Sequence, residues 1–145
     1  MTERHIQADG RVHGVAVACE GKQGRWLLIR RGRSVRAALA IAFPGGALEA
    51  GETQAQAVRR EMREELGVEV DPISCFWSYQ FPDRPLTLHG WHARLASQKL
   101  VPDPREVEEV LWLTPKEAAE HPDRTPQMEG YIAALRAYLE SRSSA

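Results

Sequence analysis

The chain has 145 residues, enough for one domain with a single core, and its 43% hydrophobic and 27% charged residues are typical of a soluble protein. A net charge of −1 argues against an extended nucleic-acid surface or a membrane-binding face. No signal peptide is visible, and the longest apolar run, 37–43, is too short to cross a bilayer. The two cysteines, Cys19 and Cys75, do not have the spacing of a metal-binding pair. They are expected to be reduced thiols of a cytoplasmic protein. We therefore expect one domain over residues 1–145.

Two strands are predicted before the first glycine-rich loop. Residues 11–19 and 25–31 are rich in β-branched and large apolar side chains, and the glycines between them predict a turn. The second run is apolar at consecutive positions, so we expect it to be covered on both faces. Arg30, Arg31 and Arg33 follow at its end. They are either solvated loop residues or contacts to a phosphate, which arginine geometry favours.

A helix is predicted over residues 53–66. Thr53 and Gln56 have the spacing of a capping box, and Gly67 stands where a left-handed residue ends a helix. A buried stripe at three- and four-residue spacing is predicted at Ala55, Val58, Met62 and Leu66. This helix should therefore pack one face against a core.

Carboxylates gather on the neighbouring face of this helix, where residues three and four apart repel one another. They are Glu61, Glu64 and Glu65. One interpretation is a solvated face on which Arg60 and Arg63 balance the charge. The other is a divalent cation that offsets the repulsion, and Mg²⁺ or Mn²⁺ is preferred because both favour oxygen ligands shared with substrate phosphates. The adjoining loop can supply the carbonyl of Gly45 as a ligand, and Gly46 lets a phosphate approach closely.

The segment from Gly46 to Val68 resembles the Nudix box. It reads G-x5-E-x7-R-E-U-x-E-E-x-G-U, where U is a bulky apolar residue. The specified positions after Gly46 are filled by Glu52, Arg60, Glu61, Met62, Glu64, Glu65, Gly67 and Val68. The resemblance implies an α/β fold, the Nudix α/β/α sandwich with a mixed β-sheet. It also implies a hydrolase that uses Mg²⁺, or Mn²⁺ in its place, to cleave nucleoside diphosphates linked to another moiety. Many relatives carry a Trp at the place of Ile41.

The resemblance implies roles for the residues of the box. The metal ligands would be the Gly45 carbonyl and the carboxylates of Glu61, Glu64 and Glu65. Arg60 would orient these glutamates, and Glu52 would stabilise the loop. Either Glu61 or a later carboxylate, Glu106, would accept the proton of the attacking water.

Residues 68–95 predict two strands joined by a turn at 81–85. The run 79–88 resembles the hairpin of MutT-type nucleoside triphosphate pyrophosphohydrolases, and residues 88–92 resemble their CTP-cleaving relatives. By this resemblance Arg84 would lie near the base and Arg31 near the substrate. His89 and His92 on the second strand are expected to be core or edge residues rather than catalysts, and no histidine set suited to zinc is apparent.

The C-terminal part predicts a strand at 108–113, a helix capped by Thr114 and Glu117, and a last helix at about 125–141. The core stripe expected on the last helix is Met128, Ile132, Leu135 and Leu139. Glu106 precedes Trp112 by the interval that separates a metal-binding or base Glu from Trp in MutT-type proteins, and Glu109 is the alternative. MutT-type proteins read oxidised guanine with an Asn at the start of the last helix. Met128 stands there in this chain, with Gln127 beside it, so we expect no strong selectivity for 8-oxo-dGTP.

The favoured function is pyrophosphohydrolysis of a nucleoside triphosphate, ordinary or modified, to a monophosphate and pyrophosphate. One alternative is hydrolysis of ADP-ribose or another nucleoside diphosphate sugar. Another is a Nudix domain that senses nucleotides without cleaving them, but every glutamate of the box is retained. The expected partner is a small nucleotide rather than a membrane or a long nucleic acid, and the protein would be a monomer or a homodimer.

Overall fold

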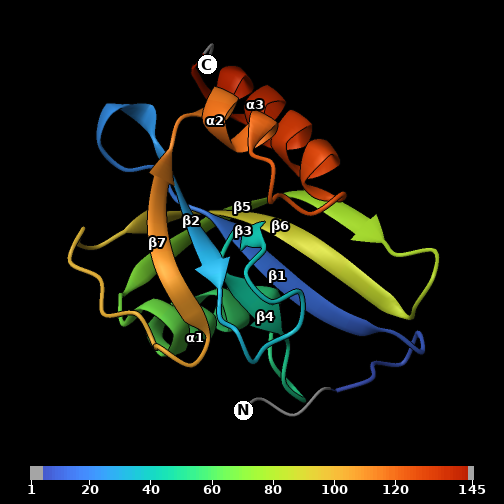
Figure 1. Ribbon diagram of the computed structural model, residues 1–145. Coiled ribbons are helices and arrows are strands. Elements are labelled where there is room, and N and C mark those ends of the chain that lie inside the picture. The colour runs from blue at the N-terminus through green and yellow to red at the C-terminus, as the bar shows by residue number, and fades with distance from the viewer. Residues whose placement is uncertain (1–4, 144–145) are drawn as a thin grey trace.

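The computed structural model describes residues 5–143, which form three layers (Figure 1). Helix α1 (Gln54–Leu66) covers one face of the central strands. Helices α2 (Pro115–Glu120) and α3 (Met128–Ser143) cover the opposite face. The mixed α/β sandwich predicted from the sequence is confirmed.

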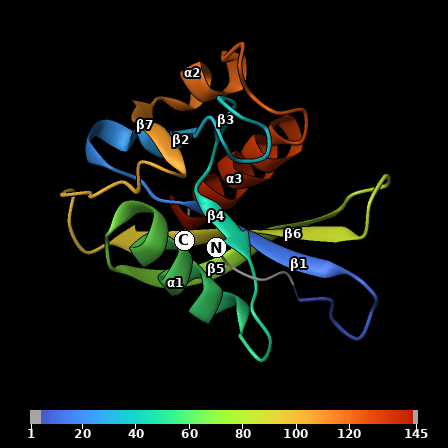
Figure 2. The ribbon, with the colours of Figure 1, turned by 60° about the horizontal axis from the view of Figure 1, so that its bottom comes forward.

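The central layer consists of two sheets. The larger one has the order β4 (Gly45–Ala47), β1 (Val12–Ala18), β6 (Leu86–Leu95) and β5 (Val70–Gln80). Strand β1 is parallel to β6 and antiparallel to β4, so this sheet is mixed. The smaller, antiparallel sheet has the order β3 (Ile41–Ala42), β2 (Trp26–Arg31) and β7 (Val107–Leu113). A short 3₁₀ helix, Lys22–Gly24, forms the turn before β2. The β5–β6 hairpin extends beyond the helices (Figure 2).

The ends of α1 follow the sequence signals. Thr53 and Gln56 form both hydrogen bonds of a capping box, and Gly67 is left-handed at φ 59°. The buried stripe differs from the prediction at its start, because Ala57 is fully buried whereas Ala55 is only partly covered. Two of the three glutamates on this helix, Glu61 and Glu65, are also buried, so the carboxylates are not a uniformly solvated surface.

Alternating residues of β1 face two separate cores. Val15 and Val17 pack with the apolar residues of α1. Ala16 and Ala18 pack with those of α3, where the Tyr131 hydroxyl donates a 2.8 Å hydrogen bond to the Ala16 carbonyl. The two cores fix the sheet between the helices and thereby set the position of Gly45 and Gly46, which lie in β4 beside β1 rather than in the predicted loop.

The last two helices agree with the sequence in kind but not in every boundary. Thr114 and Glu117 form the predicted capping box of α2. Helix α3 begins at Met128, three residues later than predicted, and continues to Ser143. His89 and His92 are buried strand residues that hydrogen-bond to Ser78 and Tyr138, as expected of core or edge histidines. Across residues 5–143, no helix is long and apolar enough to cross a membrane.

Candidate functional site

Arg60 lies at the centre of an ion-pair network that joins helix α1 to the preceding loop. Its guanidinium donates to both carboxylate oxygens of Glu52, at 2.7 and 2.9 Å, and to the Ala47 carbonyl at 2.9 Å. It also donates to Glu61 at 2.8 Å and to Glu64 at 3.2 Å. The hydrogen bonds from Arg60 lower the pKa of Glu52. The arginine thus ties the loop to the helix and fixes the Glu61 carboxylate.

Glu61 and Glu65 are the buried acids of the site, with 5% and 4% of their surface exposed. Burial raises the pKa of Glu61 to about 7, against the opposing effect of the Arg60 hydrogen bond. Burial also raises the pKa of Glu65 well above its usual value, and repulsion from Glu61 and Glu106 adds to this shift. A cation beside these groups would favour their charged forms, because an opposite charge offsets desolvation.

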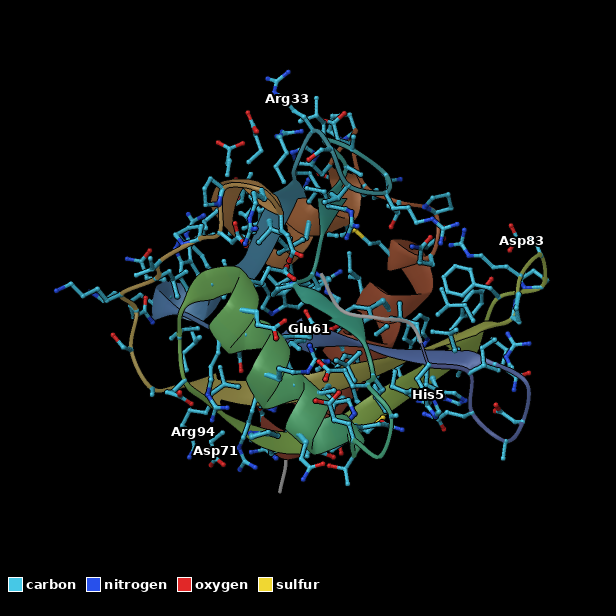
Figure 3. The ribbon with its side chains drawn as sticks, turned by 90° about the horizontal axis from the view of Figure 1, so that it is seen from below. His5, Arg33, Glu61, Asp71, Asp83 and Arg94 are labelled. Carbon is cyan, nitrogen blue, oxygen red and sulfur yellow. The ribbon has the colours of Figure 1, made fainter. Side chains whose placement is uncertain are left out.

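Gly45 and Gly46 bring the backbone against these two carboxylates. The Gly45 backbone N–H lowers the pKa of the Glu65 carboxylate, but by less than burial raises it. A side chain at Gly46 would collide with the Glu61 carboxylate, and one at Gly45 would collide with the Val15 carbonyl. In Figure 3, Glu61 lies on α1 where the helix faces β4. Close packing therefore requires both glycines, and it leaves backbone atoms rather than side chains beside the acids.

Glu106 reaches the box from a segment distant in sequence. It stands just before β7, partly buried, and its charge contributes to the raised pKa of both Glu61 and Glu65. Glu108 and Glu109 form ion pairs with arginines at 3.3 and 3.1 Å, away from this cluster. The structure thus brings Glu106, rather than the alternative Glu109, to the carboxylates of the box.

Glu64 differs from its neighbours because its side chain is 50% exposed and contacts Arg60 one turn earlier. Across residues 5–143, no three Asp, Glu, His or Cys side chains converge closely enough to form a cation site by themselves. A cation held by these carboxylates would need further oxygen ligands. Substrate phosphates and water supply such ligands in Mg²⁺ sites.

A cavity of about 300 Å³ opens beside Gly45 and Gly46 of β4. Apolar side chains of β1 and β6 line it on one side, and Phe43 and Tyr131 line it as well. Among the described residues that line it there is no Asp or Glu, but there are three arginines. Every predicted substrate contact lines the cavity: Arg31, Gly46, Arg84, Gln127 and Met128. The volume is within the range of about 300–1,000 Å³ typical of small-molecule sites. The cavity therefore suits an anionic ligand with an apolar part.

Arg36 is a lining residue that the sequence did not indicate. It belongs to the loop between β2 and β3, in which Ala37 and Leu39 have positive φ values of 50° and 64°. The Arg31 side chain donates a 2.6 Å hydrogen bond to the Arg36 carbonyl. These left-handed residues turn the loop so that Arg36 lines the same cavity as Arg31. No sequence pattern marks such a turn when it contains neither Gly nor Asn.

The chain is similar in sequence to several known proteins. A model of the NUDIX domain matches residues 10–135. The CTP pyrophosphohydrolase of Escherichia coli (strain K12) is 34% identical over 134 residues, which cover 85% of this chain and 93% of that protein. The 8-oxo-dGTP diphosphatase of the same strain is 44% identical over 66 residues, 44% of this chain and 51% of that protein. The NAD-capped RNA hydrolase NudC of Stutzerimonas stutzeri (strain A1501) is 33% identical over 95 residues, 66% of this chain and 32% of that protein. The chain thus spans about half and about a third of the length of these last two relatives.

Solved structures share the fold. The solution structure of the E. coli ORF135 protein has a TM-score of 0.74 at 28% identity and covers 93% of this chain and 95% of that one. The crystal structure of the MutT protein from Methanosarcina mazei Go1 has a TM-score of 0.77 at 16% identity, with 88% and 94% covered. The second likeness, at its low identity, concerns the fold alone.

Proposed function

The chain belongs to the Nudix family, and from this premise we propose that it is a cation-dependent pyrophosphohydrolase that cleaves a nucleoside triphosphate to a monophosphate and pyrophosphate. The observation that carries the proposal is an arginine-lined cavity whose wall includes Gly45 and Gly46 of β4, the two glycines that lie beside the buried Glu65 and Glu61. Arginines suit a polyphosphate, and buried carboxylates suit its cation. The relative matched over most of both chains is named a CTP pyrophosphohydrolase, which favours the triphosphate class.

Mg²⁺ is the proposed cation, with Mn²⁺ as a substitute. The proposed ligands are the Gly45 carbonyl and the carboxylates of Glu61, Glu64, Glu65 and Glu106. The residues fit such an ion, because all their donor atoms are oxygen and because Glu61 and Glu65 are buried acids with raised pKa values. When bound, the cation would neutralise charge on the diphosphate and make the attacking water more acidic.

The chain's own residues would bind, orient and accept a proton. Arg31 and Arg36 bind the phosphates. Gly46 allows the phosphates to approach the backbone closely. Arg60 donates to Oε1 of Glu61 and so holds that carboxylate in place. The proton of the attacking water passes to Oε2 of Glu61 or to the carboxylate of Glu106.

The nucleoside end of the ligand would lie among Arg84, Gln127 and Met128, which line the cavity together with apolar residues of β1 and β6. Because the Met128 thioether cannot supply a paired donor and acceptor, we expect at most a modest preference for 8-oxo-dGTP over dGTP. A single domain over residues 1–145, a cytoplasmic location and a monomeric or homodimeric state are part of the same proposal.

A nucleotide panel in Mg²⁺ tests the proposal. Nucleoside triphosphates, deoxynucleoside triphosphates, oxidised forms, ADP-ribose and dinucleoside polyphosphates are incubated with the protein, and the products are identified by chromatography. We expect a monophosphate and pyrophosphate from at least one triphosphate, and no turnover by Glu65→Gln. The control Glu69→Gln changes an exposed acid shortly after the end of α1, and its turnover should equal that of the wild type. Cleavage of ADP-ribose with inert triphosphates would refute the substrate class, and nucleotide binding without any turnover would indicate a sensor.

A further inference from the structure

A second, wider groove of about 940 Å³ adjoins the arginine-lined cavity. Phe81, Arg84 and Gln127 line both, so the two spaces meet around these three side chains. We propose that this groove is a second nucleoside subsite, which binds the nucleoside on the 3′ side of the first in a short 5′-phosphorylated oligonucleotide. The inference rests on the proposed function, because it takes the first cavity as the site of the 5′-phosphates and the first nucleoside.

A row of aromatic side chains on β5 and the start of the following turn forms one wall of the groove. Trp77, Tyr79 and Phe81 alternate along the chain and share one face of the strand. The rings of Trp77 and Tyr79 are parallel within 1°, with centroids 5.5 Å apart. The ring centroids of Tyr79 and Phe81 are 5.0 Å apart. Tyr79 is 37% exposed on the edge strand of the sheet. Nucleobases of any sequence stack on exposed aromatic rings, and Tyr79 is the most exposed ring of the row, since Phe81 is only 9% exposed.

The charges around the row favour one phosphate at the boundary and none beyond it. Arg84, at the shared wall, lies over the Phe81 ring at 4.4 Å, and no carboxylate among residues 5–143 forms an ion pair with it. Asp83 and Glu129 line the groove but not the first cavity. Figure 3 shows Asp83 at the tip of the hairpin. Carboxylates repel a phosphate but accept hydrogen bonds from ribose hydroxyls and base amino groups.

The order of groups along the two spaces matches a 5′-phosphorylated dinucleotide. Arg31 and Gly46 line the cavity but not the groove, so the 5′-phosphates are placed away from the second subsite. Apolar residues of β1 and β6 line the cavity and suit a nucleoside, Arg84 suits the 3′-phosphodiester, and the aromatic row suits the second base. A dinucleoside polyphosphate fits less well, because its phosphates join the two nucleosides and would have to lie between the subsites.

The test measures binding of AMP, pApA and pApApA by titration calorimetry without divalent cations. We expect pApA to bind about tenfold more tightly than AMP, the scale of one stacked base, and pApApA to bind no more tightly than pApA. Ala133→Trp should fill the groove and remove the advantage of pApA, since Ala133 lines the groove alone. Tyr79→Ala should remove it as well, with the affinity for AMP unchanged. The matched control is Ala137→Trp, an exposed alanine one turn later on α3 that lines neither space and should keep the advantage.

Several results would overturn the inference. Equal affinities of the wild-type protein for AMP and pApA would show that the groove does not bind a second nucleoside. An equal loss of AMP and pApA binding in Tyr79→Ala would assign the aromatic row to the first base. A further gain with pApApA would indicate a longer nucleic-acid surface. Because the probes are monophosphates and no cation is present, the outcome does not depend on hydrolysis. If triphosphates are inert in Mg²⁺ but pApA keeps its advantage, only the proposed function fails.

Discussion

Replacing Arg60 by alanine should destabilise the cation-free protein by about 3 kcal/mol, the lower end of the cost of leaving a buried ion-pair partner alone. The side chains of Arg60 and Glu52 are only 16% and 12% exposed and share two hydrogen bonds. Charge-assisted hydrogen bonds contribute about 1.5–3 kcal/mol each, so losing both is sufficient for this effect. The contacts to Glu61 and the Ala47 carbonyl are lost as well. A domain of this size should remain folded with a midpoint lower by about 10 °C.

The assay is urea denaturation in EDTA, with Arg63→Ala as the matched control. Arg63 lies on the same helix and donates to Glu69 at 2.6 Å, but both side chains are more than half exposed. Its loss should therefore cost no more than about 1 kcal/mol, as for other surface pairs. The double mutant Arg60→Ala/Glu52→Ala should be more stable than the sum of the single effects predicts, by about 2 kcal/mol. Equal costs for the two arginines, or additive effects of Arg60 and Glu52, would refute the buried network.

Three further predictions concern other parts of the chain. Glu106→Gln should lower kcat by about 100-fold, the scale of a lost general base, whereas Glu108→Gln should be nearly silent; equal effects in a steady-state assay would contradict the placement of Glu106. A maleimide should modify the exposed Cys75 but not Cys19 in the native protein, because burial raises the pKa of the Cys19 thiol to about 12. Mass spectrometry identifies the modified cysteine, and modification of Cys19 before Cys75 would contradict this prediction. Burial, together with the charge of His13, lowers the pKa of His89. As the pH falls, the unfolded chain therefore binds a proton at this position before the folded protein does. The free energy of unfolding should fall as the pH drops below about 6.5. The urea midpoint at pH 7.5 minus the midpoint at pH 5.5 should therefore be smaller in His89→Gln than in the wild type, with the opposite contributions of Glu61 and Glu65 common to both proteins; an unchanged value of this difference would contradict the role of His89.

Signals that act over a few residues were sufficient to predict much of the fold. The capping boxes at Thr53 and Thr114 and the left-handed Gly67 involve hydrogen bonds or dihedral angles within one or two turns. The box pattern from Gly46 to Val68 likewise lies within one continuous segment, and its resemblance to the Nudix box indicated roles for its four glutamates and Arg60. Local chemistry determines such features, so the amino-acid order alone reveals them.

Features that depend on packing between distant segments were not predictable in the same way. The burial of Glu61 and Glu65 depends on how α1 lies against the sheet, and helix periodicity gave no reason to expect it. The position of Arg36 depends on left-handed turns at Ala37 and Leu39, which are rare for such residues. Helix α3 was predicted too early because residues 125–127 belong to the segment that joins it to α2.

The two buried acids, Glu61 and Glu65, lower the stability of the fold at the proposed site. Burying a carboxylate is unfavourable unless a cation or hydrogen bonds compensate. Glu61 has the Arg60 hydrogen bond, yet burial still dominates and its pKa remains raised. For Glu65, the charges of Glu61 and Glu106 add to the effect of burial, and the opposing effects of the Arg31 charge and the Gly45 backbone N–H are smaller, so its pKa is well above the usual value. A positive charge among these three carboxylates would offset both burial and mutual repulsion, and this supports the proposed divalent-cation site.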